Sequence, residues 1–479
     1  MLYALVLQYC AIIVPLSLCH QLTTLLPLQF TGGPLLQVFL TLNMLSTCFL
    51  ATLTSSLPVL ATSALFGVWY AIYIFPPMQL PPPSGPYNVG VVDVFLKRPS
   101  PQTATFATVP EQSYIAARIL YPTLSTSSPT GASQINYQPL GAAICDRFMS
   151  FGAPGPLKAA GFLLHHWLLI RLPFLRNAPL LSTSKPLPTV VYSHGLGGSS
   201  SLYSVQSGNL ASHGNVVLVL DHQDGSTPLS STAAGEMLHH SSELYELRTD
   251  KEKGMEWDTP GYVLERRKQI EVRIEEVDGA IDILKSMNKT TRSELGGLGV
   301  DFVGRLDVED GVHLVGHSFG GATVLGAAGR FSDRVLSVTA HDPAIDWVPD
   351  DVRLNILKGN CETNMERKEG SAGYKDKKRL TEAKGLDDVP TLMIYCSEWV
   401  RTNFGHHYVT IDKLNSGKLG KKGASKGMSL KNMRHFEMSD NCLILPLWLC
   451  KVLGFSGGKP GLRSRETSAE TIGFIKSNN

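Results

Sequence analysis

The first 92 residues of this 479-residue chain contain no charged side chain. No Asp, Glu, Lys or Arg occurs before Asp93, so all 43 Lys and Arg and all 41 Asp and Glu lie in the remainder. The formal net charge is only +2 at pH 7. A chain without a basic surplus is not expected to have a nucleic-acid partner.

Motifs for metal and cofactor binding are also absent. The eight cysteines form no CxxC pair, and no HExxH sequence occurs. Such spacings are typical of zinc sites and redox centres. The sequence therefore predicts neither a metal nor a cofactor, and the cysteines are interpreted as small buried apolar side chains.

The uncharged segment is rich in Leu. Three of its apolar stretches are nearly long enough to span a membrane. The stretches are Leu2–Leu18, Leu35–Leu53 and Leu57–Phe75, and a bilayer span needs about 20 mostly apolar residues. A secretory signal peptide begins with Lys or Arg, and this segment has neither. We therefore expect two or three transmembrane helices within residues 1–80, which would make the chain an N-terminally anchored, multi-pass membrane protein.

A Pro-rich linker at residues 81–86 is predicted to separate this segment from one folded domain, residues 87–479. In that domain, short apolar runs typical of buried parallel strands alternate with helical patterns. The runs are Thr189–Ser193, Val216–Leu220, Val312–Val315, Val335–Ala340 and Thr391–Tyr395. A long helix between the second and third has one apolar stripe, formed by Ile270, Ile274, Val277, Ile281 and Leu284. The alternation predicts an α/β fold with a mostly parallel, doubly wound sheet, and the Lys-rich spans 362–385 and 413–431 are interpreted as solvated loops.

Gly316–Gly320 reads GHSFG and directly follows an apolar run. A nucleophile elbow has this form, because a serine in a tight turn between a strand and a helix needs flanking glycines to relieve backbone crowding. Small residues follow from Gly320 onward, as a helix packed behind the turn requires. Ser318 is therefore the predicted nucleophile.

A second glycine-rich segment, SHGLGG, follows the run that ends at Ser193. Loops of this type contribute a backbone N–H to an oxyanion hole in serine hydrolases. We expect the amides of Leu196 and Phe319 to be the two donors. The alternative is a glycine-rich turn without a catalytic role.

The acid and the base of such a site follow the serine in chain order. Asp342 ends the next apolar run, and Asp346 and Glu398 are its rivals for the acid. His435 is the favoured base, with His406 and His407 as the other candidates.

Several separated segments together resemble the platelet-activating-factor acetylhydrolases of the plasma and type II intracellular group. They are SGPYNVGVVDV from Ser84, VVYSHGLGGSSSLYS from Val190, LASHGNVVLVLDHQDGS from Leu210, GHSFGGAT from Gly316 and HFEMSD from His435. The resemblance extends from Ser84 to about Phe474 and implies that residues 87–479 form an α/β-hydrolase catalytic domain.

The resemblance also implies an activity and a set of residues. The activity is that of a calcium-independent serine esterase that removes short or oxidised sn-2 acyl chains from phospholipids. The family nucleophile, acid and base fall on Ser318, Asp342 and His435, and the oxyanion donors fall on Leu196 and Phe319. A family Ser-Glu pair that is not the acid matches Ser397-Glu398, which weakens Glu398 as a rival. In this chain, Pro343-Ala-Ile lies between Asp342 and Asp346 and extends the family's motif around the acid. Asp342 and Asp346 therefore both stay candidates for the acid.

We expect a phospholipid substrate taken from a membrane in which the enzyme is anchored. Two other hypotheses are open. One is an α/β hydrolase of small esters or polyesters, because such a triad specifies acyl transfer but not the leaving group. The other is a noncatalytic membrane protein that retains the fold.

Overall fold

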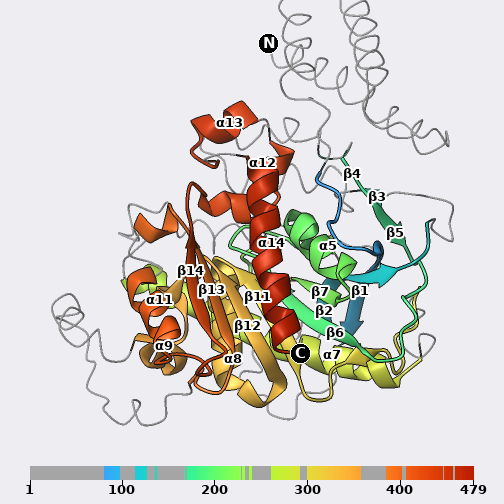
Figure 1. Ribbon diagram of the computed structural model, residues 1–479, viewed down its shortest axis with the longest axis horizontal. Coiled ribbons are helices and arrows are strands. Elements are labelled where there is room, and N and C mark those ends of the chain that lie inside the picture. Colours follow the sequence, from blue (N-terminus) through green and yellow to red (C-terminus); the bar gives the residue numbers. More distant parts are fainter. Residues whose placement is uncertain are drawn as a thin grey trace, which may run out of the picture.

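The computed structural model describes residues 80–97, 114–126, 135–136, 167, 170–227, 229–231, 237–239, 260–291, 299–357, 385–401, 406–445, 447–456 and 459–479. A mixed ten-stranded sheet lies at the centre of these residues (Figure 1). Its order is β14-β13-β12-β11-β6-β7-β2-β1-β5, and the short β10 pairs with β6.

The strands of this sheet have the following bounds: β1 Asn88–Lys97, β2 Tyr114–Thr123, β5 Phe174–Arg176, β6 Leu187–Ser193, β7 Val216–Asp221, β10 Leu306–Asp307, β11 Val312–His317, β12 Val335–His341, β13 Thr391–Cys396 and β14 Lys426–Leu430. From β7 to β14 neighbouring strands are parallel, whereas β2 runs antiparallel to both β1 and β7. Two small antiparallel pairs of strands lie outside the main sheet: β3 (Ile135–Asn136) with β4 (Arg171–Leu172), and β8 (Leu229–Ser231) with β9 (Met237–His239).

The helices are α5 Ser204–Ser212, α7 Pro260–Lys289, α8 Phe319–Arg330, α9 Asp350–Leu357, α11 His407–Asn415, α12 Asn441–Ile444, α13 Leu447–Val452 and α14 Pro460–Ser477. Short 3-10 turns are η4 Ser200–Tyr203, η6 Ser332–Arg334, η7 Ile345–Trp347, η9 Trp399–Arg401 and η10 His435–Met438.

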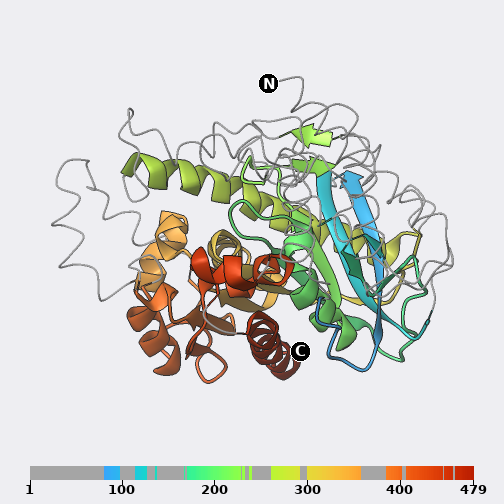
Figure 2. The same ribbon diagram turned by 90° about the horizontal axis from the view of Figure 1, so that it is seen from above.

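Both faces of the sheet are buried, because successive side chains of a strand point to opposite faces and both sets are apolar. In β6, Val191 belongs to the core beneath α7 and α8, while Val190 and Tyr192 belong to the core beneath α5 and α14. Figure 2 shows α7 and the C-terminal helix α14 on opposite sides of the sheet. The expected α/β architecture is therefore confirmed, and all five predicted runs fall within strands β6, β7, β11, β12 and β13.

Two details differ from the sequence-based expectation. The sheet is mixed, because the β1–β2 hairpin adds an antiparallel edge that no single run revealed. The span 413–431 is not only a solvated loop, since it holds the end of α11 and all of β14. Lys and Gly in β14 are compatible with a strand at the edge of a sheet, where charged side chains reach water.

The prediction of a multi-pass membrane protein is corrected by the structure. Among the residues described here, no helix is both long enough and apolar enough to cross a bilayer. The two longest described helices, α7 and α14, carry acidic and basic side chains along their length, and charges at the centre of a bilayer are costly. The three stretches predicted as spans lie within residues 1–79, outside the described residues.

Candidate active site

Ser318 occupies the sharp turn between β11 and α8. Its backbone has φ 57° and ψ −114°, a conformation rare for a residue with a side chain. The flanking glycines permit the turn: a Cβ on Gly316 would lie 2.2 Å from the carbonyl oxygen of Gly320, and a Cβ on Gly320 would lie 2.1 Å from that of Ser193. The GHSFG pattern thus forms the predicted elbow, and Ser318 lies at the carboxyl edge of the sheet.

His435 connects Ser318 to Asp342 by two hydrogen bonds. Its Nε2 lies 3.0 Å from the Ser318 Oγ, and its Nδ1 lies 3.0 Å from the Asp342 Oδ2. The Asp342 carboxylate is fully buried, and its Oδ1 accepts a hydrogen bond of 2.7 Å from the backbone N–H of Cys396. The structure therefore brings together the three side chains that the sequence favoured.

The His435 ring is fixed by its neighbours as well as by these bonds. The indole of Trp399 stacks on it with ring centroids 4.1 Å apart and planes 11° apart. The His317 ring also contacts the His435 ring, with ring centroids 4.5 Å apart and planes tilted by 41°. The His435 backbone N–H donates a hydrogen bond to the Glu398 Oε2. These contacts leave the imidazole little freedom to rotate away from Ser318.

The rival acids and bases have other partners than Ser318. Asp346 accepts a hydrogen bond from His406 at 2.8 Å, so these two candidates pair with each other. Glu398 holds the backbone of His435 and pairs with Arg434. His407 packs against Tyr395 and Tyr408. None of the four forms the hydrogen bonds that Asp342 and His435 form.

The amide of Leu196 lies in a tight loop whose other amides are occupied. Gly195 N–H donates to the Tyr203 hydroxyl, Gly197 N–H to the Ser226 carbonyl and Gly198 N–H to the Gly195 carbonyl. Within the described part of the chain, the Leu196 N–H has no such partner. Phe319 N–H is the first amide of α8 and has no carbonyl one turn earlier in that helix. Both predicted donors are therefore available.

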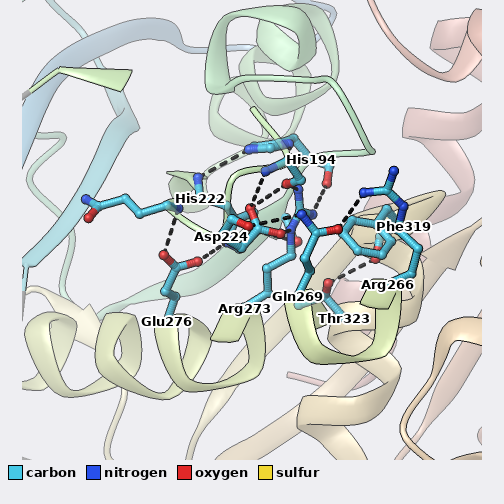
Figure 3. A network of polar contacts seen from close by, with 12 residues as sticks. His194, His222, Asp224, Arg266, Gln269, Arg273, Glu276, Phe319 and Thr323 are labelled. Atoms are coloured by element: carbon cyan, nitrogen blue, oxygen red, sulfur yellow. Dashed lines mark hydrogen bonds and ion pairs between the residues drawn. The ribbon is translucent and has the colours of Figure 1, made fainter. Parts of the chain in front are cut away.

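Sequence reasoning missed the residues that support this loop. The Tyr203 hydroxyl also bonds the His317 Nδ1 at 2.8 Å, and burial holds the pKa of His317 well below its usual range, so its ring is neutral. A further buried network joins His194, His222, Asp224, Arg273 and Glu276 (Figure 3). The segments SHGLGG and DHQDGS and the helix α7 contain these residues, but no spacing in any of them indicates that they meet.

One group of His, Cys, Asp and Glu side chains in the described residues has metal-like geometry. It consists of His317, Asp342 and His435, whose ligand atoms lie within 4.8 Å of one another. Both ring nitrogens of His435 already hydrogen-bond to Ser318 and Asp342. The contacts that these atoms make are those of proton transfer between a hydroxyl and an imidazole.

Comparison with known proteins identifies similar sequences and a similar fold. The family model "Platelet-activating factor acetylhydrolase, isoform II" matches residues 156–340, which include Leu196, Ser318 and Phe319. The platelet-activating factor acetylhydrolase of Canis lupus familiaris is 33% identical over 164 residues, 32% of this chain and 34% of that protein. The one from Cavia porcellus is 29% identical over 290 residues, 58% of each.

The chain thus spans between about a third and three fifths of the length of these relatives. Among solved structures, a ferulic acid esterase from Streptomyces cinnamoneus is similar, with a TM-score of 0.52, 15% identity, and coverage of 84% of this chain and 93% of that one. This likeness concerns the fold. The family match and the relatives together show that part of this chain is similar to platelet-activating factor acetylhydrolases.

Proposed function

We propose that this chain is a serine-dependent carboxylic ester hydrolase that acts on phospholipids through an acyl-serine intermediate. The observation that carries the proposal is the continuous pair of hydrogen bonds, 3.0 Å each, from Ser318 through His435 to the buried Asp342. A hydroxyl is a weak nucleophile unless an adjacent base accepts its proton as it attacks.

The geometry assigns one task to each side chain. The His435 Nε2 takes the proton of the Ser318 hydroxyl while Oγ attacks the ester carbonyl carbon. Asp342 accepts a hydrogen bond from Nδ1–H, which selects the tautomer with a free Nε2 and stabilises the imidazolium that forms. The protonated ring then gives its proton to the leaving alkoxide, and the acyl group stays on Ser318.

The second half of the cycle reverses these roles. Water enters after the lysophospholipid leaves, His435 removes a proton from it, and the hydroxide oxygen attacks the acyl carbon. The bond from this carbon to the Ser318 Oγ then breaks, His435 returns the proton to Oγ, and the free carboxylic acid leaves. In both halves negative charge develops on the former carbonyl oxygen, where the amides of Leu196 and Phe319 would donate hydrogen bonds. Each such donor is typically worth about 100-fold to 1000-fold in rate.

The proposed substrate is a phospholipid with a short or oxidised sn-2 acyl chain. The family match over residues 156–340 and the names of the mammalian relatives support this choice. We further propose that hydrolysis is independent of calcium, because the three side chains and two amides provide the base, the acid and the oxyanion donors that acyl transfer needs.

The test is hydrolysis of 2-acetyl and 2-palmitoyl phosphatidylcholine in the presence of a calcium chelator, with wild type and Ser318→Ala compared. We expect wild type to prefer the acetyl substrate strongly. The variant should lose at least about 1000-fold in kcat, since the nucleophile is gone. Ser416→Ala, just after α11, serves as the control and should keep wild-type rates, because the Ser416 hydroxyl bonds the Lys413 carbonyl and not a residue of the site.

Three outcomes would contradict parts of the proposal. Equal rates on both lipids would refute the chain-length selectivity, and loss of activity with chelator would refute calcium independence. A folded wild type that hydrolyses neither lipid but cleaves small soluble esters would identify a small-ester hydrolase instead.

A further inference from the structure

A buried cation, Arg273 on α7, contacts both chain segments that carry the candidate oxyanion donors (Figure 3). Its Nη1 donates a hydrogen bond of 2.6 Å to the carbonyl of His194, two residues before Leu196. Its guanidinium carbon lies 4.5 Å from the centroid of the Phe319 ring. The side chain is 0% exposed, so the guanidinium itself is shielded from solvent.

The direction of the Leu196 N–H is fixed from the other side of its peptide bond. The Gly195 carbonyl accepts hydrogen bonds from Gly198 N–H at 3.0 Å and from the His194 ring Nδ1 at 2.8 Å. A trans peptide is planar, with its C=O and N–H pointing in opposite directions. Holding the carbonyl of Gly195 therefore aims the amide of Leu196.

His194 can hold that carbonyl only if its ring stays in place with the proton on Nδ1. Its Nε2 accepts a hydrogen bond of 3.2 Å from the His222 backbone N–H, which leaves Nδ1 as the donor. Burial holds the pKa of His194 well below its usual range, so the ring is neutral. Arg273 anchors the backbone of this same residue, so the loop is held through both the ring and the carbonyl of His194.

Arg273 is itself held by the segment that follows β7. Its Nε donates to the Asp224 Oδ2 at 2.8 Å, and its Nη2 donates to the Ser226 hydroxyl. The Ser226 carbonyl in turn accepts the Gly197 N–H. One side chain from α7 thus joins the loops after β6 and β7 to the start of α8.

We propose that Arg273 is a positioning residue of the oxyanion hole, which aligns the amides of Leu196 and Phe319 without touching the substrate. The inference rests on the proposed function and assigns that site a residue outside its triad. Lys cannot take the role, because an ammonium group lacks the planar fork that reaches His194, Asp224 and Ser226 at once while lying on the Phe319 ring.

The experiment compares Arg273→Lys with wild type on 2-acetyl phosphatidylcholine, with active enzyme counted by fluorophosphonate titration. A displacement of about 1 Å in such a site costs on the order of 100-fold in rate. We expect kcat to fall about 10-fold to 100-fold, with KM changed by less than about threefold. Affinity for a trifluoromethyl ketone, whose adduct with Ser318 places an oxyanion in the hole, should fall by the same factor, and affinity for the product lysophosphatidylcholine should not.

Arg266→Lys is the matched control. Arg266 is also fully buried on α7 and lies over an aromatic ring, that of Tyr262, at 4.7 Å, but it bonds to Gln269 and not to the Leu196 loop. We expect this variant to keep wild-type kcat and trifluoromethyl ketone affinity.

The double variant Asp224→Asn with Arg273→Met tests whether a loss of activity reflects unfolding caused by an unpaired buried charge. It removes both charges of the buried pair and leaves neither unpaired. It should show the same loss of kcat and ketone affinity as Arg273→Lys. Wild-type kcat in either folded variant, or an equal loss of ketone and lysophosphatidylcholine affinity, would overturn the inference. An inert wild type would instead overturn the proposed function, and the inference with it.

Discussion

Asp342 uses both of its carboxylate oxygens in the structure. One accepts from the His435 ring and the other from the Cys396 backbone N–H, while its own N–H donates to the Ile394 carbonyl. Its φ of 42° lies in the left-handed region, which asparagine and aspartate tolerate better than most residues. The backbone at the end of β12 and its hydrogen bonds to β13 therefore fix the orientation of the Asp342 carboxylate.

Asp342→Asn is expected to lower kcat by about 10³-fold to 10⁴-fold. The amide nitrogen or oxygen that faces the His435 Nδ1 no longer enforces the tautomer that leaves Nε2 free to accept the serine proton. Asp346→Asn is the matched control, because Asp346 pairs with His406 instead. Steady-state hydrolysis by the two variants decides between the aspartates, and a larger loss in Asp346→Asn would contradict the assignment of the acid.

Single residues differ in how far the sequence could place them. Ser318 could be predicted because its strand, glycines and helix are adjacent in the chain. The pairing of His435 with Asp342 could not be fixed, because the two residues are 93 positions apart and Asp346 and Glu398 end similar segments. Trp399 and Tyr203 had no signal, since their contacts depend on how distant loops meet.

At the level of elements, the site depends on close contact between backbones. Gly320, in the first turn of α8, lies against the end of β6, where an added Cβ would come within 2.1 Å of a carbonyl oxygen. By contrast, Gly473 lies in α14, where an added Cβ would meet nothing within 4 Å. The surroundings exclude a side chain at Gly320 and leave room for one at Gly473.

We expect Gly320→Ala to destabilise the protein by about 1 to 3 kcal/mol, because the clash is with backbone that cannot rotate away. It should also lower esterase activity, because the clash lies beside Ser318. Gly473→Ala should raise the free energy of unfolding by about 0.5 to 1 kcal/mol, since alanine is the better helix former. Urea unfolding measures both; an unchanged midpoint in Gly320→Ala would refute the close contact.

The helix α7 shows where element-level prediction reached its limit. Its apolar stripe was recognised from Ile270 to Leu284, and those residues lie in the core. The apolar stripe does not indicate that the polar side chains beside it are buried, yet those of Arg266, Gln269, Arg273 and Glu276 are. Periodicity reports which side of a helix is apolar, but not that loops from two other strands cover its polar side.

At the level of the whole molecule, several histidines are buried in a neutral form. Burial lowers the pKa of His313 to about 4 and of His341 to about 3, and it holds those of His194, His222 and His317 well below the usual range. The unfolded chain binds a proton at each of these rings near pH 6.5, whereas the folded chain does not. Their contribution to stability is therefore complete above pH 6.5 and is lost as the pH falls below it.

The free energy of unfolding should accordingly fall between pH 7 and pH 5, by about 1.4 kcal/mol per pH unit below 6.5 for each such histidine. His313→Asn removes one of them at a position away from Ser318. The pH dependence of this variant should be shallower by one histidine's share in urea titrations at pH 7.0 and 5.5. Identical slopes for variant and wild type would contradict the assignment of His313 as neutral.

The overall architecture was largely predictable, because alternating apolar runs and helical patterns are local features that one sequence displays. The division into residues 1–80, 81–86 and 87–479 stays a prediction. The membrane localisation was wrong for the part of the chain described here, where charged side chains run along both long helices.

The base and the oxyanion loop share one support. The η10 turn that carries His435 is followed by Asp440, whose carboxylate accepts the Val205 N–H and whose N–H donates to the Leu202 carbonyl. Leu202 and Val205 belong to η4 and α5, which directly continue the loop that contains Leu196. We therefore expect that a fluctuation which moves His435 away from Ser318 also displaces the loop that contains Leu196. If so, the predicted site opens as a unit, and a partly opened molecule would not present an activated serine to other electrophiles.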